Sequence, residues 1–145
     1  MCIRDRAYSL GAMGHLFCFD AASGKVLWSH DLDQQYGIQM PIWGISASPI
    51  VYGNHVIVQI GGKANACIVS FDQATGKEKW RALDDGIVYV SPILIKQAGK
   101  DILVTWTAKR VVALCPKAGQ VYWEFPFPSS IGIANKFIKP RLTEM

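Results

Sequence analysis

Short runs of apolar residues, each ended by a turn, dominate this 145-residue chain. The runs are rich in Val, Ile, Tyr, Trp and Phe and are bounded by Gly, Asn, Asp or Pro, a pattern that favours β-strands. One stretch predicts four strands in succession, at residues 48–52, 55–60, 67–71 and 78–83. A second stretch predicts the same series at residues 91–95, 101–106, 110–114 and 121–125. The sequence therefore predicts an all-β fold built from successive four-stranded units.

The two ends of the chain depart from this regular series. Strands predicted at residues 7–12, 16–19 and 26–30 make a first unit that lacks its opening strand. Residues 1–6 resemble neither a strand nor a signal peptide, since they hold no apolar segment, and we interpret them as a non-native remnant. Residues 129–145 are predicted to begin a further unit or to form a disordered tail. The predicted repeat region is residues 7–128, with units at 7–32, 45–83 and 88–127.

An eleven-residue pattern occurs once in each unit. In the second unit Asp72 opens a turn in which its carboxylate can accept backbone N–H groups, and Gly76 suits a positive φ. Trp80 follows on the returning strand, where its large ring buries area and its N–H needs a partner. The corresponding residues are Asp20, Gly24 and Trp28 in the first copy, and Gly119 and Trp123 in the third, where Cys115-Pro116 replaces the Asp.

The spacing of the copies predicts the architecture. The pattern recurs after 52 and then 43 residues, and Ser48-Pro49 recurs as Ser91-Pro92 after 43 residues. A period of about 40–50 residues is typical of solenoids and propellers. Four strands per period indicate β-propeller blades.

The pattern resembles the tryptophan-docking motif of the PQQ-like, or quinoprotein-type, β-propeller repeat family. The resemblance covers residues 7 to about 128 and implies that Trp28, Trp80 and Trp123 pack between neighbouring blades rather than contact a substrate. We predict a fragment of such a propeller, with about two and a half to three four-stranded antiparallel blades. Because propellers close with about four to eight blades, the missing blades of its own propeller are its first expected partners.

Composition excludes several classes of function. The net charge is +4 and the basic residues form no stripe, so a nucleic-acid partner is not expected. No apolar run approaches the roughly 18 residues of a membrane span. The four cysteines show no Cys-x-x-Cys spacing, so we predict no metal site and interpret them as small buried thiols.

The segment at residues 33–44 supplies the extra length of the longer repeat. We predict a loop on the propeller face near the channel mouth, where scaffolded loops commonly carry function. The candidate binding residues are Gln39, Trp43 and Ser46, with Tyr89 at the equivalent position of the next blade. The alternative is that the loop only covers the channel rim. Asp84 and Asp85, in the linker between blades, are interpreted as solvated carboxylates that point apart.

Two functions remain open. We favour a binding or scaffolding module that takes a protein partner or small ligand at the propeller face. The alternative is a fragment of a PQQ- and calcium-dependent alcohol dehydrogenase. The resemblance implies that such enzymes carry adjacent cysteines, a calcium-binding carboxylate and Asn, and a catalytic Asp. No adjacent cysteines occur, and no catalytic residue or cofactor is assigned; PQQ and calcium remain possible only in the full-length protein. The resemblance also implies a periplasmic or extracellular location.

Overall fold

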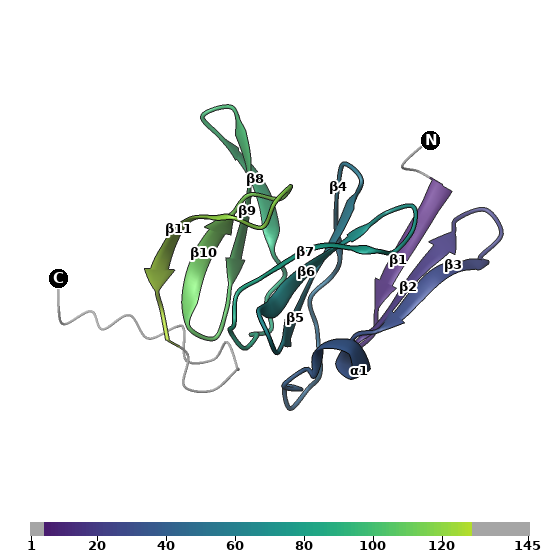
Figure 1. The fold of residues 1–145 in the computed structure, drawn as a ribbon, viewed down its shortest axis with the longest axis horizontal. Helices are drawn as coiled ribbons and strands as arrows, with labels where there is room; N and C mark the ends of the chain where they lie inside the picture. The colour runs from purple at the N-terminus through teal and green to yellow at the C-terminus, as the bar shows by residue number, and fades with distance from the viewer. Residues whose placement is uncertain (1–4, 129–145) are drawn as a thin grey trace.

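Three antiparallel sheets follow one another along the chain in the computed structural model, which describes residues 5–128 (Figure 1). The first sheet holds β1 (Arg6–Leu10), β2 (His15–Asp20) and β3 (Val26–Asp31). The second holds β4 (Ile50–Tyr52), β5 (His55–Gly62), β6 (Ala66–Asp72) and β7 (Glu78–Ala82). The third holds β8 (Ile93–Gln97), β9 (Lys100–Trp106), β10 (Arg110–Leu114) and β11 (Val121–Pro126). The predicted all-β class is confirmed, and residues 1–4 and 129–145 lie outside the described residues.

Every sheet is a meander in which each strand pairs with the next one in sequence. Most predicted strand bounds differ from the observed ones, by at most two residues. The first strands of the second and third sheets begin at Ile50 and Ile93, two residues later than predicted, because Pro49 and Pro92 have no N–H to give to a ladder. Arg6 belongs to β1, pairs with Asp20 and donates to the Gln73 carbonyl at 2.8 Å, so it is part of the blade.

The motif turns have one shared geometry. Asp20 Oδ1 accepts from the backbone N–H groups of Ala22 and Ser23 at 3.1 and 2.8 Å. Asp72 Oδ1 accepts from its two equivalents at 2.9 Å each. The third turn lacks the carboxylate, yet the Gly119 N–H still donates to the Cys115 carbonyl at 2.8 Å, as the glycines do in the other two turns. The three motif glycines have φ of +71°, +72° and +70°, so the left-handed residue fixes the turn even where the Asp is missing.

The motif tryptophans join one sheet to the next. Trp28 Nε1 donates to the Gln73 carbonyl at 3.1 Å, and its ring lies over Gly76, where a Cβ would come within 2.7 Å of it. Trp80 Nε1 donates to the Pro116 carbonyl at 3.2 Å, and its ring covers Gly119. A half-buried indole N–H needs a hydrogen-bond acceptor, and in both cases the following sheet supplies it.

The core lies between the sheets and is centred on the second one. All of β5 is buried, and so is β6 except for Asp72, because the second sheet is covered on both faces. In contrast β8 and β11 are exposed along their whole length. The largest fully buried aromatic is Phe71, whose ring stacks with His30 at 4.7 Å between centroids.

The inserted segment was predicted to be a loop, and this was wrong for its first turn. Residues Leu32–Tyr36 form helix α1. Asp31 caps the helix by accepting from the Gln34 N–H, and Gly37 ends it in the left-handed region. Tyr36 then donates from its hydroxyl to Glu78 at 2.6 Å and packs against Gly62, which fixes α1 beside the second sheet (Figure 1).

Candidate functional site

The meander places successive turns at opposite ends of each sheet, so the molecule has two rims (Figure 1). The motif rim holds the hairpin turns after β4 and β8 and the three motif turns. The linker rim lies at the end marked by α1 in Figure 1. It consists of residues 11–14, 32–49, 62–65, 83–92 and 107–109. All four predicted binding residues fall on the linker rim.

Hydrogen bonds hold the backbone of the loop after α1, while its side chains are exposed to solvent. The Trp43 N–H donates to the Tyr89 hydroxyl at 3.0 Å, and the Ile45 N–H donates to the Ala12 carbonyl at 2.8 Å. Gly44 has φ of +75°, and a Cβ there would be 2.6 Å from the Ala12 oxygen, so only glycine allows this close approach. Trp43 is 72% exposed beside Ile42, which is 74% exposed. The loop therefore displays an apolar pair on a fixed backbone.

The four predicted site residues do not form one cluster. Trp43 and Tyr89 meet through the hydrogen bond between them, and Ser46 is exposed on the same loop. Ser48 and Ser91, which precede equivalent prolines in the two linkers, also contact each other, since the Ser48 N–H donates to Ser91 Oγ at 3.1 Å. Gln39 instead lines a separate cavity of about 230 Å³. The other residues that line this cavity are Gly61, Gly62, Lys63, Asp84, Asp85, Gly86 and Lys109.

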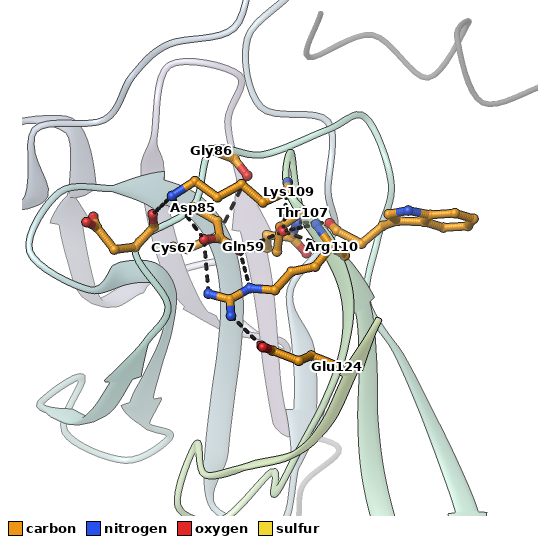
Figure 2. A network of polar contacts seen from close by, with 10 residues as sticks. Gln59, Cys67, Asp85, Gly86, Thr107, Lys109, Arg110 and Glu124 are labelled. Carbon is orange, nitrogen blue, oxygen red and sulfur yellow. Dashed lines mark hydrogen bonds and ion pairs between the residues drawn. The ribbon is translucent and has the colours of Figure 1, made fainter. Parts of the chain in front are cut away.

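Asp85 was predicted to be solvated, and this was wrong. Its side chain is 1% exposed and receives hydrogen bonds from Thr107 Oγ1 at 2.7 Å and from Arg110 Nε and Nη2 at 2.8 and 3.1 Å (Figure 2). Lys109 Nζ lies 3.5 Å from Asp85 Oδ1 and donates to the Asp84 carbonyl at 2.8 Å. Arg110 also pairs with Glu124. The network ties the linker between blades to the third sheet, while Asp84 is exposed as predicted.

The electrostatics of this network keep Asp85 charged. Burial alone would raise the pKa of Asp85, but hydrogen bonds from Arg110 and Thr107, together with the Arg110 and Lys109 charges, lower it below its ordinary value. Burial raises the pKa of the neighbouring Cys67 thiol to about 12, so that thiol stays protonated. A buried carboxylate paired in this way is a structural anchor, because both of its oxygens already accept hydrogen bonds.

Polar side chains gather around Asp85 on both sides. A second cavity, of about 330 Å³, is lined by Asp84, Asp85, Lys109, Arg110, Glu124 and Pro126. Lys109 and Asp84 line both cavities, so the two cavities adjoin across the linker. Within residues 5–128 no three His, Cys, Asp or Glu side chains gather as metal ligands would. The arrangement can hold a polar ligand through charged and amide groups.

Sequence reasoning missed Lys63, Lys109 and Arg110. The turn that contains Lys63 belongs to the second blade, and the turn with Lys109 and Arg110 takes the same place in the third. An alignment of these two turns by the repeat would have shown charged residues at positions that the repeated motif does not include. The contacts of Lys109 and Arg110 with Asp85 could not be predicted, because these residues are 24 and 25 positions away from Asp85 in sequence.

Comparison with known proteins decides the family. The family model described as outer membrane protein assembly factor BamB matches residues 3–136. The chain belongs to the PQQ-like repeat family. The match also begins inside the segment that was interpreted as a non-native remnant. The part of the chain that the structure describes contains no helix with the length and apolar content that crossing a membrane requires.

Relatives within the family are bacterial proteins. The quinoprotein ethanol dehydrogenase of Pseudomonas aeruginosa is 26% identical over 134 residues, which is 83% of this chain and 21% of that protein. The 1-butanol dehydrogenase (quinone) of Thauera butanivorans is 29% identical over 104 residues, which is 67% of this chain and 16% of that protein. This PQQ-like chain thus spans about a fifth of the length of the curated relatives it matches.

Solved structures show the same fold. BamB from Moraxella catarrhalis superposes with a TM-score of 0.57 at 21% identity, covering 84% of this chain and 33% of that chain. Quinohemoprotein alcohol dehydrogenase from Comamonas testosteroni superposes with a TM-score of 0.62 at 19% identity, covering 84% of this chain and 19% of that chain. These neighbours are β-propellers, so the three sheets are propeller blades.

Proposed function

We propose that this chain is part of a PQQ-like propeller that works as a binding or scaffolding module, with the linker rim as its binding face. The observation that supports this most is the exposed pair Ile42 and Trp43 on a loop whose backbone is held by Tyr89 and Ala12. Residues 34–54 carry no charged side chain, which suits an apolar contact with a protein partner. Tryptophan is enriched among the residues that dominate binding energy at protein interfaces.

The adjoining cavities support a polar contact next to this apolar one. Gln39 and Lys63 line one cavity, and Arg110 and Glu124 line the other. Because Gln39 precedes Trp43 by four residues on the same loop, a partner that contacts Trp43 can also contact an amide group, as the polar rim of an interface requires. We place the module in the periplasm or outside the cell, in line with the family.

The alternative function is part of a PQQ- and calcium-dependent alcohol dehydrogenase. It is favoured by the two curated relatives, which are named as dehydrogenases. The residues of this chain do not fit the cofactor, since the sequence has no adjacent cysteines and both oxygens of the buried Asp85 are taken by Arg110 and Thr107. A calcium site would require six or more oxygen ligands. We therefore derive no catalytic step.

A photo-crosslinking amino acid placed at Trp43 of the full-length protein, expressed in its native host, tests the binding function. The matched control carries it at Asn54, which is exposed in the turn after β4 of the second sheet and lies outside the linker rim. We expect a discrete protein adduct from position 43 and none from position 54. Equal adducts from both positions, or none from either, would contradict the proposal. Alcohol oxidation by the same protein loaded with PQQ and calcium would support the alternative.

A further inference from the structure

A cavity of about 280 Å³ opens on the motif rim, where the second and third sheets meet. Both sheets have four strands among the described residues, so the cavity lies between two successive blades of this chain. Its lining comes from β4 of the second sheet and from the third sheet, and includes Tyr52, Lys100, Asp101, Cys115, Lys117 and Tyr122. A thiol, two amines and two phenols therefore border one space, away from the proposed binding face.

Cys115 takes the place of the motif aspartate in the third turn, 43 residues after Asp72. Asp72 accepts from the backbone N–H groups of Thr75 and Ala74 at 2.9 Å each, and these bonds lower the pKa of its carboxyl group. The Cys115 sulfur accepts from the backbone N–H groups at the same two positions of its own turn. The turn therefore offers the sulfur the hydrogen-bond donors that stabilise a negative charge in the preceding blade.

Cys115 also differs from the other described cysteines in its surroundings. It was interpreted from the sequence as a small buried thiol, and this was wrong, because it is partly exposed. Burial alone would raise its pKa, but hydrogen bonds from the Tyr122 hydroxyl and the backbone, together with the Lys117 charge, lower it below its ordinary value. Cys18 and Cys67 are fully buried, and burial raises the pKa of Cys67 to about 12. Within residues 5–128, Cys115 is therefore the thiol that is both accessible and readily ionised, and the thiolate is the form of cysteine that reacts.

The charges around the cavity favour a negatively charged ligand. Lys100 and Lys117 both line it, and among the described residues neither forms an ion pair with a carboxylate. The carboxylate in the lining, Asp101, accepts from the Tyr52 hydroxyl at 2.8 Å and pairs with a lysine that does not line the cavity. Lys100 Nζ is 6.0 Å from the ring centre of Tyr122, whose hydroxyl donates to the thiol sulfur. Two positive charges without a carboxylate partner thus border the same cavity as the sulfur.

We propose that Cys115 is a modification site for small, negatively charged disulfides, which the cavity admits and its two lysines attract. The Cys115 thiolate attacks one sulfur of the disulfide, so that a new S–S bond forms and the S–S bond of the disulfide breaks. The departing sulfur leaves with the electron pair as a thiolate and takes a proton from water. The Cys115 sulfur is oxidised and the released half of the disulfide is reduced, so the exchange needs no other oxidant. The protein then carries the remaining half as a mixed disulfide.

Oxidised glutathione and cystamine test the proposal on the full-length protein, because the first disulfide is negatively charged at neutral pH and the second is positively charged. Peptide mapping by mass spectrometry measures how fast each forms a mixed disulfide at position 115. Lys100→Gln combined with Lys117→Gln should lower the ratio of the oxidised glutathione rate to the cystamine rate by at least about tenfold, the lower range of electrostatic steering. Lys25→Gln combined with Lys77→Gln, in the other two motif turns, should leave the ratio unchanged. No adduct at position 115, or a ratio that is the same in both double variants, would overturn the proposal.

Iodoacetamide, which is uncharged, tests the state of the thiol separately from the lysines. Cys115 should be alkylated faster than Cys67 in the folded protein, since Cys67 is buried and protonated. Tyr122→Phe should slow the alkylation of Cys115 several-fold, because the hydroxyl no longer stabilises the thiolate. Tyr36→Phe, which removes a hydroxyl bonded to Glu78, is the matched control and should leave the rate unchanged. Alkylation of Cys67 as fast as Cys115, or a Tyr122→Phe rate equal to that of the wild type, would contradict a reactive thiolate at this cavity.

Discussion

The two rims of the molecule differ in how much they repeat. On the motif rim, three turns share their backbone bonds and left-handed glycines, even where Cys115 replaces the aspartate. On the linker rim, Asp85 joins the turn at residues 107–110, and the equivalent turn of the second blade has no such carboxylate contact among the described residues. Repeated contacts stack one blade on the next, whereas exposed residues that occur in one blade only, such as Ile42 and Trp43, are not needed by the repeat and can contact a ligand. The rim that builds the fold is therefore not the rim we assign to function.

Removing Trp80 should have the largest effect of any change on the motif rim. We expect Trp80→Ala to lower the free energy of unfolding by about 3–5 kcal/mol, because it empties the space over Gly119 and leaves the Pro116 carbonyl without its donor. Trp43→Ala is the control and should cost less than about 0.5 kcal/mol, as for an exposed residue. Denaturant unfolding measures both. Equal costs for the two variants would remove the distinction between the rims.

Breaking the Asp85 network should have the next largest effect. Arg110→Met should lower the free energy of unfolding by about 2–3 kcal/mol at neutral pH, because it leaves a buried carboxylate without its main partner. Adding Asp85→Leu should recover part of that loss, since no charge then remains to be paired. Denaturant unfolding of the single and double variants checks this. A double variant that is less stable by the sum of both single losses would contradict the pairing.

A pair of glycine variants separates the contact with a tryptophan ring from the backbone strain of a side chain at positive φ. Gly24→Ala and Gly76→Ala both place a side chain at positive φ, near +71° and +72°. Only Gly76→Ala also forces a Cβ to within 2.7 Å of Trp28, so we expect it to cost about 1–3 kcal/mol more, as overpacking does. Thermal unfolding of dilute protein measures the difference. Equal losses would mean that Trp28 does not rest on Gly76 in solution.

The smallest expected effect concerns acid stability. The folded pKa of Asp85 lies below its unfolded value of about 3.9, so its stabilising contribution is complete above that pH and is lost as the pH falls further. Asp85→Asn should therefore show a shallower loss of stability below about pH 4 than the wild type. Unfolding curves at a series of pH values check this. Parallel pH dependences would show that Asp85 is not held charged by Arg110 and Thr107.

The sequence predicts the motif rim well because its signals are local. A glycine in a left-handed turn, an acceptor four residues before it and a tryptophan four residues after it lie within one hairpin. Their spacing also predicted three successive blades, since the same period places each tryptophan beside the next turn. The third turn keeps its backbone hydrogen bond although Cys115-Pro116 supplies no carboxylate, and the sequence had not predicted this.

The linker rim could not be predicted to the same depth. Helix α1 has five residues, too few for a helical period to show, and its cap Asp31 also ends a strand. Asp85 is buried only because Arg110 and Thr107 reach it from the next blade. Trp43 was identified as a candidate from its place in an unusual insertion, but its partner Tyr89 lies 46 residues away.

A double-mutant cycle between Trp80 and Gly119 tests most directly whether the repeated motif joins successive blades. In the wild type, a Cβ at Gly119 would lie 2.5 Å from the Trp80 ring. Gly119→Ala should therefore be costly when Trp80 is present and should cost only backbone strain when it is alanine. We predict a coupling free energy of at least about 1 kcal/mol between the two positions. Additive costs would contradict the account, because they would mean that the two residues do not touch.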